Sequence, residues 1–164
     1  MSIEELCQWL ENSTVGTAII GSNWLFPIIE GTHVLALGLA VGIVVLSDLR
    51  LMGVIMRNKP ASLVWSQLAP WMIGGIAVMF VSGGLLFWSQ ATKAYASNYF
   101  RVKMILLVAA AVNAAEYHLT ICKRMKEWDT APVPPPQARA AGWISLILWA
   151  GIIVMGRTIA YTSF

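Results

Sequence analysis

The sequence predicts an all-α integral membrane protein, a four-helix bundle with a short N-terminal amphipathic helix at the membrane interface. Apolar residues make up 58% of the 164 residues, more than a soluble globular protein usually carries. Four apolar stretches are long enough to cross a bilayer as helices, which takes about 20 residues each. They run over residues 27–46, 68–88, 104–122 and 140–161, so residues 1–164 are expected to form a single membrane domain.

The N-terminal segment, residues 2–12, is predicted to form the interfacial helix. Ser2 followed by Glu5 is a capping-box pattern. Apolar residues recur at helical spacing on one side, and acidic residues fill the other, which favours a helix lying on the membrane surface. The alternative is a first-turn extension of the bundle.

Prolines indicate where the first two spans begin. Pro27 and Pro70 each precede a long apolar run, and proline suits the first turn of a helix. The first helix is expected to continue beyond the bilayer and to stop at residues 58–60. The second span is rich in glycine, which allows close helix packing or the approach of a flat cofactor. These glycines are Gly74, Gly75, Gly83 and Gly84.

The basic residues predict the orientation. The first and third loops carry seven lysines and arginines, and the opposite side carries four. Because cytoplasmic loops hold the excess of positive charge, both termini are expected on the outer side. These residues are loop anchors rather than one basic face, so nucleic acid is not an expected partner.

Ionisable residues form a group in the outer half of the predicted bundle. Glu30 and His33 are three residues apart and share one face of the first span. Arg101 and Lys103 begin the third span, and Arg157 lies near the end of the fourth. Because charged groups within a span cost a few kcal/mol, they usually face the bundle interior and have a function. We expect these five side chains to converge.

This group is suited to haem b. Imidazole is a usual axial ligand of haem, and haem propionates pair well with arginine. His33 is therefore the predicted iron ligand, Arg101 and Arg157 are predicted to hold the propionates, and Glu30 is expected beside them. A haem in the membrane would serve electron transfer or a small redox reaction.

The second iron ligand is less clearly indicated. His33 is expected about 6 Å outside the bilayer centre and His118 roughly 9 Å inside it. One iron cannot easily take both histidines of a single chain. Lys103, or Met79 in the middle of the second span, is the alternative ligand, with His118 a weaker candidate.

A second polar group is predicted at the inner ends of the first and third spans. It comprises Asp48, Arg50, Asn113, Glu116 and His118. On a regular helix Asn113, Glu116 and Tyr117 share a face, and His118 points elsewhere. A buried pair between Glu116 and Arg50 would hold the two helices together.

Several stretches resemble a bacterial family of small four-span membrane proteins of unknown function. They are IEGTHVLALGLAVGIVVLSDLRLMG, PWMIGGIAVMFVSGGLLFW, FRVKMILLVAAAVNAAEYH and GRTIAY. The resemblance extends over nearly the whole chain and implies the bacterial inner membrane, where the orientation predicted from the basic residues would make both termini periplasmic. It brings no established activity.

The layout is also similar, more distantly, to HemJ-type protoporphyrinogen oxidases and to CopD-like membrane domains. These have a histidine in an early span. In the HemJ pattern this histidine and a lysine that starts the third span are the expected haem-b ligands, which match His33 and Lys103. The residues DLRL after the first span are similar to an arginine-containing turn of that family.

Three classes of function follow. The first is a haem-b protein, either an oxidoreductase or a subunit of a larger complex, with a quinone or a redox protein as partner. The second is a transport or assembly protein for protons or for a metal such as copper, which His and Met ligands suit. The third is a structural membrane subunit. Self-association or a larger membrane complex is expected for all three.

Overall fold

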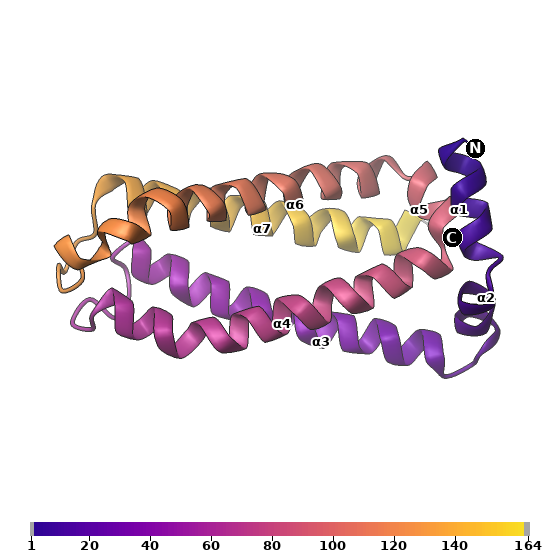
Figure 1. Ribbon diagram of the computed structural model, residues 1–164, viewed down its shortest axis with the longest axis horizontal. Coiled ribbons are helices and arrows are strands. Elements are labelled where there is room, and N and C mark those ends of the chain that lie inside the picture. Colours follow the sequence, from indigo (N-terminus) through magenta and orange to yellow (C-terminus); the bar gives the residue numbers. More distant parts are fainter. Residues whose placement is uncertain (1, 163–164) are drawn as a thin grey trace.

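The bundle predicted from the sequence is confirmed. A computed structural model describes residues 2–162, and these residues contain seven α-helices and no β-strand (Figure 1). Four helical segments are long and apolar enough to cross a membrane: Leu25–Leu51, Ala61–Ser89, Asn98–Glu127 and Pro136–Tyr161. The chain is therefore a multi-pass membrane protein.

The long helices form two antiparallel hairpins. Helix α3 (Leu25–Leu51) pairs with α4 (Ala61–Ser89), and α6 (Asn98–Glu116) pairs with α7 (Pro136–Thr162). Contacts between α3 and α7 join the hairpins, whereas α4 and α6 have few close backbone contacts and meet through the stacked rings of Phe87 and Phe100, 5.4 Å apart. Figure 1 shows both hairpins running along the long axis of the molecule, with α4 and α6 apart.

Three short helices gather at the end of the bundle where both termini lie (Figure 1). They are α1 (Ile3–Glu11), α2 (Thr14–Gly21) and α5 (Ala91–Ala96). The predicted capping box is present, with Ser2 Oγ accepting from the Glu5 N–H at 3.2 Å. Helix α1 lies across the end of the bundle and does not extend a span. The Trp88 indole N–H donates to Ser13 Oγ at 2.9 Å and ties α4 to α2.

The prediction that Pro70 begins the second span is wrong. Helix α4 begins nine residues earlier, at Ala61, and contains Pro70 in its interior. The side chain of Asp129, from the third loop, accepts from the Ser62 N–H and from its hydroxyl, each at 2.7 Å. These bonds satisfy groups that a helix start leaves unpaired and hold the pKa of Asp129 below its usual value. A distant carboxylate thus supplies the helix start that the local sequence does not show.

The first long helix also ends before the predicted stop at residues 58–60. It continues through the expected residues to Leu51 and then ends at Gly53, whose φ is +73°. Only glycine adopts this left-handed conformation without strain, and it commonly ends helices.

The third span changes helical type towards its inner end. After α6, a π-helical turn (η1) covers Tyr117–Ile121 and a 3-10 turn (η2) covers Cys122–Glu127. The π-helix is wider than the α-helix and is rare in proteins, but where it occurs it is often at a functional site. This change alters which side chains face the bundle interior.

The main core lies between α3, α4 and α7. Gly75 allows α3 and α4 to approach closely, because a Cβ atom there would lie 3.1 Å from the Ala40 Cβ. The buried residues of this core are Ala36, Val41, Val44, Met79, Trp149 and Ile152.

Candidate functional site

His33 lies half-buried on α3 and faces α4. Its Nδ1 is 3.0 Å from Ser82 Oγ. The Ser82 hydroxyl has one proton, which it donates to the Val78 carbonyl at 2.7 Å. With the Ser82 proton in this bond, Ser82 accepts from the Nδ1–H of His33, and we assign Nε2 as the proton-free nitrogen. An imidazole fixed through one nitrogen with a lone pair on the other is the state in which histidine binds metals.

Gly83 provides the space for this imidazole. A Cβ atom on Gly83 would lie 3.0 Å from Cε1 of His33, so the imidazole would have to move by a few tenths of an ångström. The neighbouring Gly84 has open space around it. Only one of these two glycines is thus required by the histidine.

Lys103 is on α6, and the structure brings it towards His33. The charge of Lys103 acts on the His33 ring across the outer half of the bundle. The ammonium group also lies beside α7, where a Cβ atom on Gly156 would be 3.6 Å from Nζ. The two residues predicted as iron ligands therefore face the same region from different hairpins.

The outer arginines and Glu30 are exposed. Arg101 lies over the Tyr95 ring, 5.1 Å from its centroid, and Arg157 lies over the Tyr161 ring at 5.3 Å. Arg157 also donates to the Tyr161 hydroxyl at 3.1 Å. Glu30 forms no hydrogen bond or ion pair with any residue that the structure describes. These side chains lie around the histidine region without contacting one another.

Met79 borders the His33 imidazole only through its backbone carbonyl, and His118 lies far from it. Met79 is 6% exposed, and its side chain belongs to the apolar core. His118 lies at the opposite end of the bundle, next to Trp65, with the two ring centroids 4.8 Å apart. Among residues 2–162 no three His, Cys, Asp or Glu side chains are placed to hold a metal ion together.

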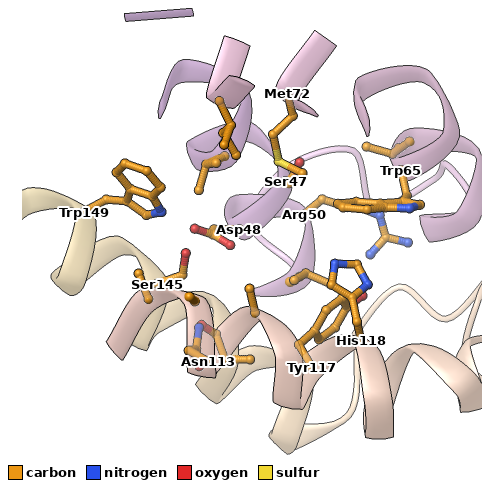
Figure 2. A pocket seen from close by; sticks show the side chains of 18 of the residues that line it. Ser47, Asp48, Arg50, Trp65, Met72, Asn113, Tyr117, His118, Ser145 and Trp149 are labelled. Atoms are coloured by element: carbon orange, nitrogen blue, oxygen red, sulfur yellow. The ribbon is translucent and has the colours of Figure 1, made fainter. Parts of the chain in front are cut away.

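A cavity of about 250 Å³ lies in the inner half, between all four long helices (Figure 2). Helix α4 contributes Trp65, Met72, Ile76 and Phe80, and α6 contributes mainly alanines. The lining residues Phe80 of α4 and Ala111 of α6 are exposed, so the cavity opens between these two helices towards the surrounding lipid. Its wall is apolar except at the inner end.

Buried polar side chains of α3 line that inner end. Asp48 is 6% exposed and Arg50 is 2% exposed. Arg50 donates through Nε and Nη2 to the Lys59 carbonyl, at 3.2 and 2.8 Å. Its Nη1, Asp48 Oδ2 and Ser47 Oγ have no hydrogen-bond partner among the described residues. Figure 2 shows Asp48 pointing towards Ser145 of α7, inside the cavity.

The π-helical turn brings Tyr117 and His118 to this cavity together. Their ring centroids are 5.2 Å apart, and both rings line the wall near Arg50 (Figure 2). The expectation that His118 points elsewhere assumed a regular α-helix and is wrong. Glu116 is exposed, and Arg50 is bonded to the first loop, so the expected pair between these two residues does not form.

A family model described as a family of unknown function (DUF6644) matches residues 7–162. The chain belongs to this family. No curated protein and no solved structure matches it. Because the description of DUF6644 states no activity, the likeness of this member to HemJ-type oxidases and CopD-like domains stays a prediction.

Sequence reasoning missed several residues of this DUF6644 protein that matter at both sites. Ser82 was overlooked because a serine in an apolar helix usually bonds its own backbone, as Ser82 also does here. Trp65 and Ser145 gave no signal, because a bundle places them beside the cavity only through its packing. The glycine pair that follows Ser82 was the one feature of the sequence that could have indicated a site at this place on the second span.

Proposed function

We propose that this protein binds haem b in the outer half of the bundle and handles electrons within the membrane, alone or as a subunit of a larger complex. The observation that supports it most is the His33–Ser82 hydrogen bond, which fixes the imidazole and leaves Nε2 free to bind iron. Bound haem would supply one-electron chemistry. Gly83 fits a histidine ligand at this position because it leaves room for the His33 imidazole ring.

Lys103 is the proposed second ligand, since it faces the same region from α6. Arg101 and Arg157 are proposed to bind the propionates. Each arginine now lies over a tyrosine ring at the surface and would leave that ring to pair with a propionate. Glu30 would lie at the rim of the site. Buried Met79 and distant His118 are less suitable ligands than Lys103.

An optical spectrum of the protein purified from cells supplied with haem tests the proposal. We expect a Soret band that shifts on reduction with dithionite. The band is expected to disappear in His33→Ala and to shift or weaken in Lys103→Met. A wild-type protein without a Soret band, or one unchanged by His33→Ala, would refute the haem site.

Neighbouring glycines offer a matched pair of variants. Gly83→Ala places a methyl group against His33, whereas Gly84→Ala adds one in open space. Haem binding is expected to fall in Gly83→Ala and to be unchanged in Gly84→Ala. Equal loss in both variants would indicate a general effect on α4 and contradict the placement of the site.

The proposal includes the bacterial inner membrane, with both termini periplasmic, and self-association. Excess positive charge in the first and third loops supports this orientation. Gly38 and Gly42 lie one turn apart on an exposed part of α3 with open space around them, which suits close approach of another helix. Labelling of a single cysteine introduced in either loop of intact cells tests the orientation, and cross-linking tests the association.

A further inference from the structure

We propose that the inner cavity binds a lipid-soluble quinone, with its ring at the polar end and its tail leaving between α4 and α6. This site is separate from the proposed haem site and does not depend on it. Its residues come from the inner part of the bundle, and His33 and Lys103 are not among them.

The shape of the cavity selects an amphiphile that arrives through the bilayer. The wall between α4 and α6 is apolar, and Phe80 at its outer part is 59% exposed to the lipid side. The polar residues are confined to the far end, next to the first loop. A molecule with a small polar head and a long apolar tail matches this arrangement, whereas a water-soluble substrate does not.

The side chains around the polar end favour a flat ring. Trp65, Tyr117 and His118 form an aromatic cluster on one side, with ring centroids 4.8 and 5.2 Å apart. Opposite α4, the α6 wall carries the small side chains of Ala110 and Ala114, which leave room for a planar group. Aromatic side chains prefer stacked or edge-on contacts with such rings.

Unpaired polar atoms define the chemistry of the head group. Arg50 Nη1 can only donate a hydrogen bond, Asp48 Oδ2 accepts one unless the carboxyl is protonated there, and Ser47 Oγ can do both. Buried groups of this kind are costly unless a partner satisfies them. A quinone carbonyl accepts from an arginine, and the hydroxyl of its reduced form donates to a carboxylate. An ionised fatty acid can accept from Arg50 but has no hydrogen-bond donor for Asp48 Oδ2.

Calorimetric titration of the purified full-length protein tests the proposal. The probes are decylubiquinol, decylubiquinone and, as the anionic lipid, palmitate. We expect saturable binding of both quinone forms with one site per chain, tighter for the quinol, and no saturable binding of palmitate. Tighter binding of palmitate, or no saturable binding of either quinone form, would overturn the proposal.

A pair of variants on α6 locates the site. Ala111 lines the cavity, whereas its neighbour Val112 does not and is 59% exposed. Ala111→Phe should fill the opening and weaken quinol binding at least tenfold. Ala114→Phe is a second variant with the same expected effect, for use if Ala111→Phe folds poorly. Val112→Phe should bind as the wild type does. Equal affinity in the filled variants would overturn the proposal.

The polar end is tested by Asp48→Asn, which keeps the shape and removes the charge. We expect quinol affinity to fall several-fold and quinone affinity to change little, so that the preference between the two forms is lost. An unchanged preference would contradict the role of Asp48. His33→Ala should bind both probes as the wild type does, so failure of the haem proposal and failure of this one are distinguishable.

Discussion

The two ends of the bundle handle charge in opposite ways. In the outer half, Arg101 and Arg157 are exposed and rest on nearby tyrosines. In the inner half, Asp48 and Arg50 are 6% and 2% exposed, and each keeps a polar atom without a protein partner. The sequence predicted a polar group in each half and placed the haem site in the outer one, yet the buried charges lie in the inner half.

This contrast shows that ionisable residues at the same end of a bundle need not be buried there or depend on one another for partners. The outer cations can be replaced in the folded protein at little cost, because solvent or lipid head groups can take over their contacts. The inner groups are surrounded by all four long helices, so their burial must be offset by internal bonds or by a ligand. Folding should therefore depend on the inner end, and the proposed haem binding on the His33 region.

The largest effect is expected for Arg50→Met. The variant leaves the Lys59 carbonyl without its two donors from the buried Arg50 and releases the first loop from α3. Hydrogen bonds to charged groups contribute about 1.5–3 kcal/mol each, so the free energy of unfolding should fall by about 3 kcal/mol. Unfolding titrations in SDS measure it. Arg124→Met, which removes an exposed ion pair with Glu127, is the control and should leave the titration midpoint unchanged.

A smaller effect is expected for Ser82→Ala at the outer site. Loss of the bond to His33 leaves the ring free to rotate and to change tautomer. Removing such a supporting bond typically lowers metal affinity by about 10- to 100-fold. Haem titration followed by the Soret band provides the measurement, while the SDS midpoint should move little. A large loss of stability with unchanged haem affinity would contradict the view that the outer end serves haem binding and the inner end serves folding.

The seam between α3 and α4 gives the next effect. Gly75→Ala brings a methyl group within 3.3 Å of the Ala40 Cα, whereas Gly74→Ala meets no atom within 4 Å. Overpacking of this kind costs about 1–3 kcal/mol. The free energy of unfolding should fall for Gly75→Ala and be equal or higher for Gly74→Ala. Equal losses would show that α3 and α4 are not in contact at this point.

The smallest effect concerns pH and Asp129. Its bonds from Ser62 lower its pKa below the ordinary value of 3.8, so they stabilise the folded state above that pH and are lost as the pH falls through the lowered pKa. Thermal midpoints measured from pH 6 to pH 3 should fall further for the wild type than for Asp129→Asn. Parallel curves would indicate that this cap contributes nothing.

Sequence reasoning reached the class of fold because membrane spans are specified by local composition. Capping of α1 was predictable for the same reason, since Ser2 and Glu5 are close in the chain. The start of α4 was not, because it depends on Asp129, which lies 67 residues after Ser62. Similarly, the position of His118 depends on a π-helical turn that no pattern in the sequence predicts. His33 was correctly expected on a face towards other helices, but its partner Ser82 came only from the packing.

The opening between α4 and α6 also sets the route by which a molecule would exchange with the inner cavity. Through this opening a ligand would enter from the lipid, so neither loop would need to move and no step would pass through water. Occupancy would follow the mole fraction of the ligand in the lipid phase rather than its concentration in the buffer. Excess detergent would therefore strip the ligand by dilution, and reconstitution into a small volume of lipid would restore it.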